Sequence, residues 1–244
     1  MLDVGGESTR PGARRVPAAE QISRVVPIIE AIRACQDPVV ASIPISVDTT
    51  LAEVARAAID AGADAINDVS GASEDPRLLA VAAESGAGLV LMHRAAAPPH
   101  DHYADEHPRE PDYEGGVLCA VCKSLEAQAQ RALAAGISRG SLVVDPGLGF
   151  GKSVDQNMLL VRGIDRLASM GLPVYVGASR KRFIGRISGA GGGQPADRLG
   201  GSIAVTILAA QRGALLHRVH DVAEQVQALS MLEAGGQKAG DPRE

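Results

Sequence analysis

Seven short apolar runs divide the chain, and each of them stops at a polar or glycine-rich cluster. Short runs of this kind are typical of strands that are buried on both faces of a parallel sheet. We therefore predict strands that contain Leu2–Val4, Ile43–Val47, Ala65–Ile66, Leu89–Met92, Leu142–Val144, Val174–Val176 and Ala214–Leu216.

Helical patterns fill the segments between these runs. Thr50 and Glu53 fit a capping box, and apolar residues recur after them at helical spacing. Pro76 suits the first turn of another helix, which ends at Gly86. Pro27 lies inside the first predicted helix, which should therefore be kinked or begin later. The remaining predicted helices are Gln21–Cys35, Val117–Ala135, Val154–Met170, Gly201–Gln211 and Val222–Glu233.

The alternation of strand and helix predicts an α/β fold with parallel strands and right-handed crossovers. Nearly every strand end carries polar residues, which favours a closed (β/α)8 TIM barrel over an open doubly wound sheet. Such barrels have roughly 250 residues, and this chain has 244. Because seven strand ends are visible, we expect residues 1–233 to form strands 2–8 of a barrel that is incomplete at its N-terminus. We expect residues 234–244 to form a flexible tail.

Composition and charge narrow the range of partners. The net charge is −5 and no basic stripe is present, which argues against nucleic acid and anionic membranes as partners. The chain contains no run of about 18 apolar residues and no signal-peptide pattern at its start. Its three cysteines, an odd number, argue against a disulfide framework, so we expect a cytoplasmic protein.

Polar acceptors follow three of the predicted strands, at Asp48, Asn67 and Asp145. A carboxylate accepts two hydrogen bonds side by side, which suits the adjacent N–H and NH₂ groups of an amino-heterocycle. Asparagine offers both an acceptor and donors, so it can bind a mixed edge of such a ring. Each residue alone could instead cap a helix or bond a loop. Together at one end of a barrel, they predict a site for a flat polar ring.

Cationic residues form a second group at the predicted strand ends. Arg218 and His220 lie two residues apart at the last strand, so we expect them on the same side of it. Lys181 follows the preceding strand, and Thr9 and Arg10 lie in the first loop. Arginine and lysine at a barrel mouth suit phosphate, and the last strands of such barrels often supply a phosphate site. Ion pairing with carboxylates of the barrel is the simpler alternative.

Two loop segments need separate interpretation. The run DPGLGFGKS is close to a nucleotide-binding loop, but Pro146 stands where that motif requires glycine, so we expect the glycines to let the backbone approach a flat ligand. Phe150 in this loop, and Phe183 further on, either face a ligand or fill the barrel mouth. Residues 95–116 hold four prolines and three histidines and predict a surface lid or insert, with a metal site as the alternative.

Seven motifs then occur in an order that resembles the dihydropteroate synthases, a family of pterin-binding enzymes. They are GGESTRPGA, SVDTT, INDVSG, LMH, DPGLGFGKS, VGASRKRF and RVHDV, and the resemblance extends from residue 2 to about residue 230. It implies condensation of (7,8-dihydropterin-6-yl)methyl diphosphate with 4-aminobenzoate in folate synthesis, a reaction that sulfonamides inhibit. It also implies a homodimer that uses Mg²⁺.

The resemblance assigns roles by motif position. Diphosphate would leave first, and the aminobenzoate nitrogen would then attack a cationic pterin methylene, so no protein nucleophile is required. The implied pterin-binding residues are Asp48, Asn67, Asp145 and Lys181. The implied diphosphate-binding residues are Thr9, Arg218 and His220. The implied 4-aminobenzoate pocket is lined by Thr9, Arg10, Pro11, Phe150, Ser179 and Arg182.

The chain departs from the family pattern in three places. The family opens with a strand that ends in LNVTPDSFSDGG and carries an asparagine ligand of the metal, so we expect no metal ligand in this chain and impaired turnover. Arg94 replaces the second methionine that is common after LMH. Arg182 stands where some members have serine, and it could pair with the aminobenzoate carboxylate.

Two other functions remain as alternatives. A pterin-binding methyltransferase domain that acts with a corrinoid protein would share the barrel and the pterin-binding residues. It would not need the SRKRF and RVHDV clusters. A non-catalytic, pterin-binding remnant would bind the ring without forming a product.

Overall fold

The computed structural model describes residues 1–107, 109–189 and 193–236. All seven apolar runs form strands, and these lie side by side in chain order in one sheet. Every neighbouring pair is parallel, which confirms the predicted α/β architecture. The strands are β1 (Leu2–Gly5), β2 (Ile45–Asp48), β3 (Ala65–Asp68), β4 (Gly88–Met92), β5 (Leu142–Asp145), β6 (Val174–Val176) and β7 (Ala214–His217).

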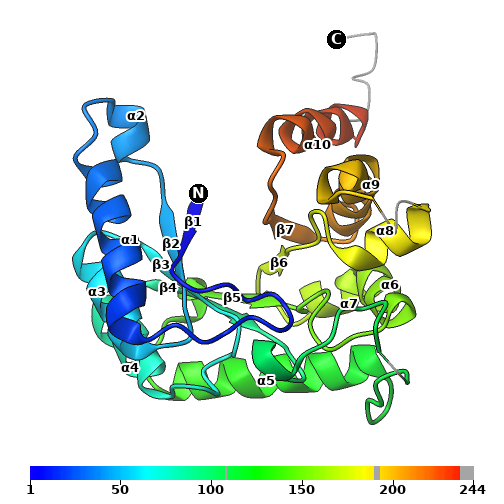
Figure 1. Cartoon of the computed structure of the whole chain (residues 1–244), viewed down its shortest axis with the longest axis horizontal. Coiled ribbons are helices and arrows are strands. Elements are labelled where there is room, and N and C mark those ends of the chain that lie inside the picture. Colours follow the sequence, from blue (N-terminus) through cyan, green and yellow to red (C-terminus); the bar gives the residue numbers. More distant parts are fainter. Residues whose placement is uncertain (108, 190–192, 237–244) are drawn as a thin grey trace, which may run out of the picture.

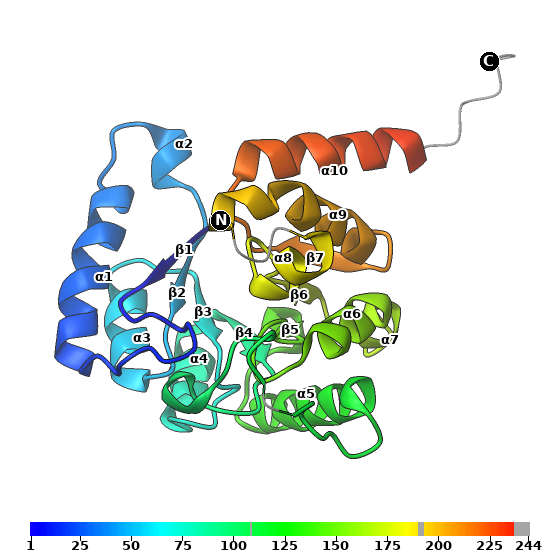
Figure 2. The same cartoon turned by 45° about the vertical axis from the view of Figure 1, so that its right-hand side comes forward.

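The sheet curls into the greater part of a barrel, with helices around its outside (Figure 1). Strand β1 pairs with β2, and β7 pairs with β6; within the described ranges neither strand has a partner on its other side. Figure 2 shows the same arrangement from a second direction, with α10 crossing above α9. The fold is therefore of the TIM-barrel type, with seven strands in the expected order.

Helices connect the strands as the sequence predicts, with several differences in their bounds. The main helices are α1 (Ala18–Arg33), α2 (Pro38–Ala41), α3 (Ala52–Asp60), α4 (Arg77–Ser85), α5 (Val117–Ala134), α6 (Val154–Arg162), α7 (Ile164–Ala168), α8 (Arg182–Ser188), α9 (Leu199–Ala210) and α10 (Val222–Gly236). Helix α1 starts before the predicted residue and contains Pro27, so the later start was wrong. Helix α10 runs to Gly236, and residues 237–244 of the expected tail lie outside the described residues.

The predicted helix over 154–170 is divided in two at Gly163. A side chain at this position would collide with Leu118 of α5, since an added Cβ would lie 2.5 Å from a Leu118 methyl carbon. Glycine therefore allows α5 to pack closely there, and it also ends α6. Helices α2 and α8 are too short to give a periodic apolar signal, and the sequence did not predict them.

Small and branched aliphatic residues make up most of the core, as the low aromatic content requires. Strands β2 and β3 are buried along their whole length, which explains why they read as continuous apolar runs until their final polar residues. Phe183 is completely buried among core residues and fills space there, whereas Phe150 is half-buried in the β5–α6 loop. None of the helices in the described part of the chain has the length and apolar character that a membrane span requires.

Candidate active site

The carboxyl ends of the strands form one polar edge of the sheet. In the parallel register, Gly5 lies beside Asp48, and Asp48 lies beside Asn67. Asp145 lies beside Met92 at the ends of β5 and β4. The three acceptors that the sequence singled out, Asp48, Asn67 and Asp145, therefore meet at this edge, and all three are buried.

Arg218, which lies just beyond β7, connects the last strand to the first two. Its Nε lies 2.7 Å from Asp3 Oδ2, and its Nη2 lies 3.2 Å from Asp48 Oδ2. Asp3 also accepts hydrogen bonds from Asn67 Nδ2 at 3.1 Å and from Ser46 Oγ at 2.7 Å. Residues from both ends of the chain thus form one network. Arg218 forms ion pairs with carboxylates of the barrel, which was the alternative to phosphate binding that the sequence left open.

Asp48 is the residue of this network that is best prepared to bind a ligand. Burial, followed by the charge of Asp3, raises the pKa of its carboxyl from 3.8 to about 7, although the charge of Arg218 opposes them. Its Oδ1 is buried and has no hydrogen-bond partner among the described residues. A buried acceptor without a partner is costly, so a donor from a ligand would stabilise it.

Asp145 and Lys181 lie at the opposite side of the same edge. Burial raises the pKa of the Asp145 carboxyl, while the nearby charge of Lys181 acts against that shift. Asp145 Oδ1 accepts a hydrogen bond of 2.7 Å from the Gly147 amide. Lys181 Nζ donates to the Leu148 carbonyl and lies 4.4 Å from the centre of the Phe150 ring. Burial lowers the pKa of this lysine to about 8.

The DPGLGFGKS loop is shaped by its glycines and by a buried lysine. Gly147 has a φ of +67°, and an added Cβ would lie 1.9 Å from the His93 carbonyl oxygen. Lys152 is completely buried, and its Nζ donates to the carbonyls of His93 at 3.3 Å, Gly147 at 2.9 Å and Phe150 at 2.8 Å. Burial lowers the pKa of Lys152 to about 7. This lysine therefore holds the loop from within, rather than facing a phosphate.

The candidate anion site lies in the loops after β6 and β7. Strand β7 ends at His217, so Arg218 and His220 are loop residues and the expectation that they share one face of a strand was wrong. Arg218 contacts Asp3 and Asp48, whereas His220 Nδ1 lies 3.0 Å from Ser179 Oγ. Burial, followed by the charges of Arg180 and Arg218, lowers the pKa of His220. The surroundings of His220 are therefore positively charged, which suits an anion.

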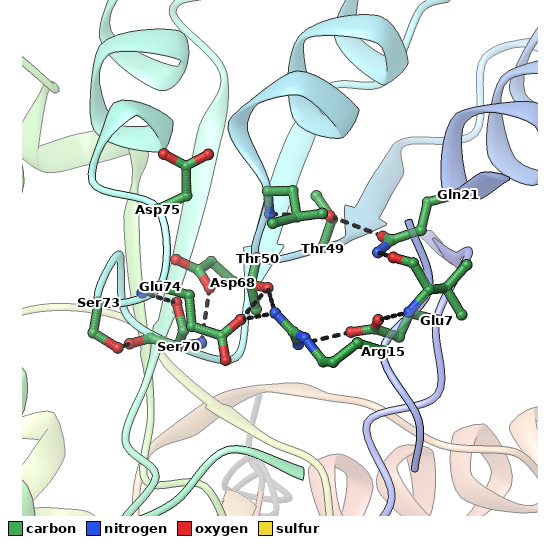
Figure 3. Close-up of polar contacts among 12 residues, drawn as sticks. Glu7, Arg15, Gln21, Thr49, Thr50, Asp68, Ser70, Ser73, Glu74 and Asp75 are labelled. Carbon is green, nitrogen blue, oxygen red and sulfur yellow. Dashed lines mark hydrogen bonds and ion pairs between the residues drawn. The ribbon is translucent and has the colours of Figure 1, made fainter. Parts of the chain in front are cut away.

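The β1–α1 loop, residues 6–17, carries Thr9, Arg10 and Pro11. Arg10 is exposed, and Thr9 and Pro11 are partly buried. Figure 3 shows how polar contacts attach this loop to the strand ends beside it, with Arg15 lying between Glu7 on one side and Glu74 on the other. The loop is therefore held by charged contacts on residues that the sequence did not single out.

Arg182 makes different contacts from those expected of a residue that binds a carboxylate ligand. Its Nε lies 3.2 Å from Asp105 Oδ1, it forms a second ion pair with Glu106, and its guanidinium lies 4.4 Å from the centre of the Tyr103 ring. These partners belong to the 95–116 segment, which contains one short 3₁₀ helix at Pro98–His100. Arg182 thus attaches that segment to α8, and its contact with aminobenzoate stays a prediction.

Two residues of the site, Asp3 and Lys152, were not predicted from the sequence. Asp3 lies inside the apolar run Leu2–Val4 and is part of that predicted strand. Side chains alternate along a strand, so Asp3 faces the side opposite to Leu2 and Val4 and the same side as Gly5. This alternation was the available signal for a polar role. Lys152 belongs to the DPGLGFGKS motif, and one of its hydrogen-bond partners, the His93 carbonyl, is remote in the sequence.

Comparison with known proteins identifies the family. Residues 1–220 match the family described as "Pterin binding enzyme". A dihydropteroate synthase from Mycobacterium leprae is 42% identical over 237 residues, which cover 96% of this chain and 79% of that protein. A dihydropteroate synthase from Synechocystis is 40% identical and covers 96% of this chain and 76% of that protein.

Solved structures agree with this assignment. The dihydropteroate synthase of Xanthomonas albilineans with 4-aminobenzoic acid has a TM-score of 0.85 and 42% identity, over 98% of this chain and 80% of that chain. The same enzyme in complex with 7,8-dihydropteroate has a TM-score of 0.83 and 40% identity, over 98% of this chain and 79% of that chain. The chain therefore belongs to the family of pterin-binding enzymes that includes these dihydropteroate synthases.

Proposed function

We propose that this protein is a dihydropteroate synthase, which condenses (7,8-dihydropterin-6-yl)methyl diphosphate with 4-aminobenzoate to give 7,8-dihydropteroate and diphosphate. One observation carries the proposal: the buried Asp48 Oδ1, which has no partner among the described residues, lies at the same edge as Asn67 and Asp145. Relatives of known structure hold 4-aminobenzoate and dihydropteroate, the second substrate and the product of this reaction.

The pterin ring would bind between the two ends of this edge. Asp48 would accept N–H groups of the ring. Asn67 Nδ2 donates one hydrogen bond to Asp3, which leaves the second amide N–H and the amide oxygen for an edge of the ring that has both acceptors and donors. Asp145 uses Oδ1 for the Gly147 amide, so its other oxygen would accept from the ring. Lys181 lies over Phe150 beside Asp145 and would complete the ring site.

The diphosphate would lie toward Arg218, His220 and Thr9. When the carbon–oxygen bond of the methyl diphosphate breaks, its electron pair stays on the diphosphate oxygen and positive charge develops on the pterin methylene. Arg218 would stabilise the leaving anion, while the partly buried carboxylate of Asp3 and the buried one of Asp48 would stabilise the developing cation. The aminobenzoate nitrogen would then attack that carbon and lose a proton.

The 4-aminobenzoate pocket would lie between the β1–α1 loop and the loops after β5 and β6. Thr9, Arg10 and Pro11 would contribute from the first loop, Phe150 and Ser179 from the other two, and Arg182 from the start of α8. Ser179 Oγ already contacts His220, so the aminobenzoate and diphosphate parts of the site would share this hydroxyl. A sulfonamide would compete for the same pocket.

A requirement for Mg²⁺ is part of the proposal, but the donor set does not provide a magnesium site. No group of three or more histidine, cysteine, aspartate or glutamate side chains converges as metal ligands in the described part of the chain. Arg218 contacts one oxygen of Asp3 and one of Asp48, their Oδ2 atoms, and the unpartnered Asp48 Oδ1 is the atom proposed to accept from the pterin ring. Chelation by EDTA tests the requirement.

We also propose that the protein acts as a homodimer in the cytoplasm. Val226 and Met231 on α10 expose more than half of their surface, at 57% and 69%, which supports a partner near the C-terminal helices. The three cysteines are free, which suits a reducing compartment. Light scattering on the purified protein measures the mass of the particle, and a monomer at micromolar concentration would contradict the dimer.

Turnover with both substrates tests the proposed function. We expect the purified chain to form dihydropteroate and diphosphate in equal amounts, detected by mass spectrometry, and a sulfonamide to compete with 4-aminobenzoate. Methyl transfer from methyltetrahydrofolate to a corrinoid protein would instead support the methyltransferase alternative. Pterin binding without any product, at saturating concentrations of both substrates, would support a non-catalytic binding protein.

A further inference from the structure

Glu74 lies where four loops of the candidate site meet. It belongs to the β3–α4 loop, and its Oε2 accepts hydrogen bonds from Arg15 of the β1–α1 loop and from Thr50 after β2. Its other oxygen, Oε1, accepts from Arg94, which follows β4. Figure 3 shows Glu74 directed toward Thr50 and Arg15 from its own loop. One carboxylate therefore connects loops from four consecutive strands.

The loop that carries Glu74 is itself firmly built. The buried Asp68 carboxylate accepts hydrogen bonds from the backbone amides of Ser70, at 2.7 Å, and Ala72. Ser70 Oγ accepts a further hydrogen bond of 3.3 Å from the Glu74 amide. Glu74 is thus presented from a rigid turn, so it can serve as a fixed point for its neighbours.

The β1–α1 loop depends on that fixed point. Arg15 Nη1 lies 2.8 Å from Glu7 Oε1, and Glu7 also accepts from the Val16 amide, so these contacts join the two ends of the loop. At the tip, the Gly12 amide donates to the Pro98 carbonyl at 2.7 Å. The loop is therefore closed by Glu7, attached to the 95–116 segment at its tip, and attached to the rest of the barrel through Arg15.

Arg94 extends the same connection to the 95–116 segment, which begins with the next residue. The side chain of Arg94 is almost fully buried, at 6% exposure, and Glu74 is its ion-pair partner. Burial alone would raise the pKa of Glu74, but the hydrogen bond from Thr50 and the charges of Arg94 and Arg15 outweigh it and lower the pKa. Glu74 is therefore charged at neutral pH and attracts an arginine on each side.

We propose that Glu74 is a positioning residue for the 4-aminobenzoate pocket. It binds both Arg15 and Arg94, and it thereby fixes the position of the β1–α1 loop relative to the 95–116 segment around the substrate. This inference rests on the proposed function, since the pocket residues Thr9, Arg10 and Pro11 belong to that loop. Glu74 acts through Arg15 and Arg94 and does not contact the substrate. Arg94, which departs from the methionine common in the family, gives this chain a charged partner for Glu74 at that position.

The substitution Glu74→Gln tests the proposal because it keeps the shape of the side chain and removes its charge. We expect the KM for 4-aminobenzoate to rise roughly tenfold, since a charged contact that positions the loop is lost. The KM for the pterin diphosphate should rise less, by about twofold to threefold, because Asp48, Asn67 and Asp145 are not attached to Glu74 and only Thr9 of the proposed pterin diphosphate contacts lies in the β1–α1 loop. Glu74→Asp keeps the charge and should recover part of the affinity for 4-aminobenzoate.

A matched control is the surface pair between Arg56 and Glu84, in which Glu84 is 63% exposed. Glu84→Gln removes the same kind of ion pair away from the site and should leave both KM values unchanged. If Glu74→Gln does not fold, Arg15→Gln breaks the same connection from its more exposed side and carries the same expectation.

A second readout does not depend on catalysis. Hydrogen exchange of the peptide over residues 6–17 should be several times faster in Glu74→Gln than in the wild type, and unchanged in Glu84→Gln. If the wild type forms no dihydropteroate, the proposed function fails, while the exchange measurement still tests the connection. Unchanged exchange, or an equal rise of both KM values, would overturn the positioning role.

Discussion

Asp48 combines two properties that usually oppose each other, because it is buried among other acids and yet it is the acceptor best placed for a ligand. Burial raises the pKa of Asp48 to about 7 in the folded protein, from the ordinary value of 3.8 that applies to the unfolded chain. Between these pH values the folded state binds more protons than the unfolded state. Stability therefore falls as the pH rises through this window, and the loss is complete above pH 7.

The variant Asp48→Asn removes the cost of a buried charge. Each pKa unit corresponds to about 1.4 kcal/mol, and the pKa of about 7 already includes the attraction of Arg218, so we expect the ligand-free variant to be more stable by about 2–4 kcal/mol at pH 8. At pH 4 the difference should vanish, because Asp48 is then protonated in the folded wild type. Urea denaturation at both pH values measures this, and a variant that is less stable at pH 8 would contradict it.

Gly147 is constrained both by its backbone conformation and by the space around it. It adopts a φ of +67°, and an added Cβ would lie 1.9 Å from the His93 carbonyl oxygen. Gly86 has a similar φ of +71°, but an added Cβ there would meet no atom within 4 Å. The two glycines therefore share the backbone requirement and differ in the available space.

This pair allows the cost of the collision to be measured separately. Gly86→Ala should cost about 1 kcal/mol, the usual penalty of a left-handed conformation for alanine. Gly147→Ala should cost at least about 3 kcal/mol, because the His93 carbonyl must move and the Lys152 contacts that depend on it are disturbed. Denaturation of both variants gives the comparison; equal losses would show that space at Gly147 does not matter.

The strands were predicted from the sequence more accurately than the helices. Each strand is a largely apolar run that ends at a polar residue or a glycine, and this local signal survives in the structure because both faces of the sheet are covered. The break at Gly163 depends on Leu118 of another helix, and α2 and α8 span too few turns to show a period. These features depend on tertiary contacts, so no local pattern could reveal them.

The same distinction applies to the loops of the site. Asp48, Asn67 and Asp145 were found because each one stops an apolar run. Asp3 and Glu74 were missed because their roles come from partners that are remote in the sequence, Arg218 for Asp3 and Arg15 for Glu74. Arg182 was assigned to a ligand by motif position, but its actual neighbours lie in the 95–116 segment.

The curl of the sheet creates the site. Asp3 on β1 and Arg218 after β7 are almost at opposite ends of the chain. Asp3 Oδ2 and Arg218 Nε are nevertheless 2.7 Å apart, because the curled sheet brings its first and last strands toward each other. A ligand that binds to this network contacts strands from both halves of the fold. Its binding should therefore stabilise the whole sheet rather than one loop.

Calorimetry tests whether this strand edge is the pterin site. It measures the binding of (7,8-dihydropterin-6-yl)methyl diphosphate to the wild type, to Asp48→Asn and to the control Glu84→Gln. We expect the wild type and the control to bind equally, and Asp48→Asn to bind at least about a hundredfold more weakly, because the ring loses its charged acceptor while the protein stays folded. Asp48→Asn that binds the pterin diphosphate as tightly as the wild type would contradict the assignment of this strand edge as the pterin site.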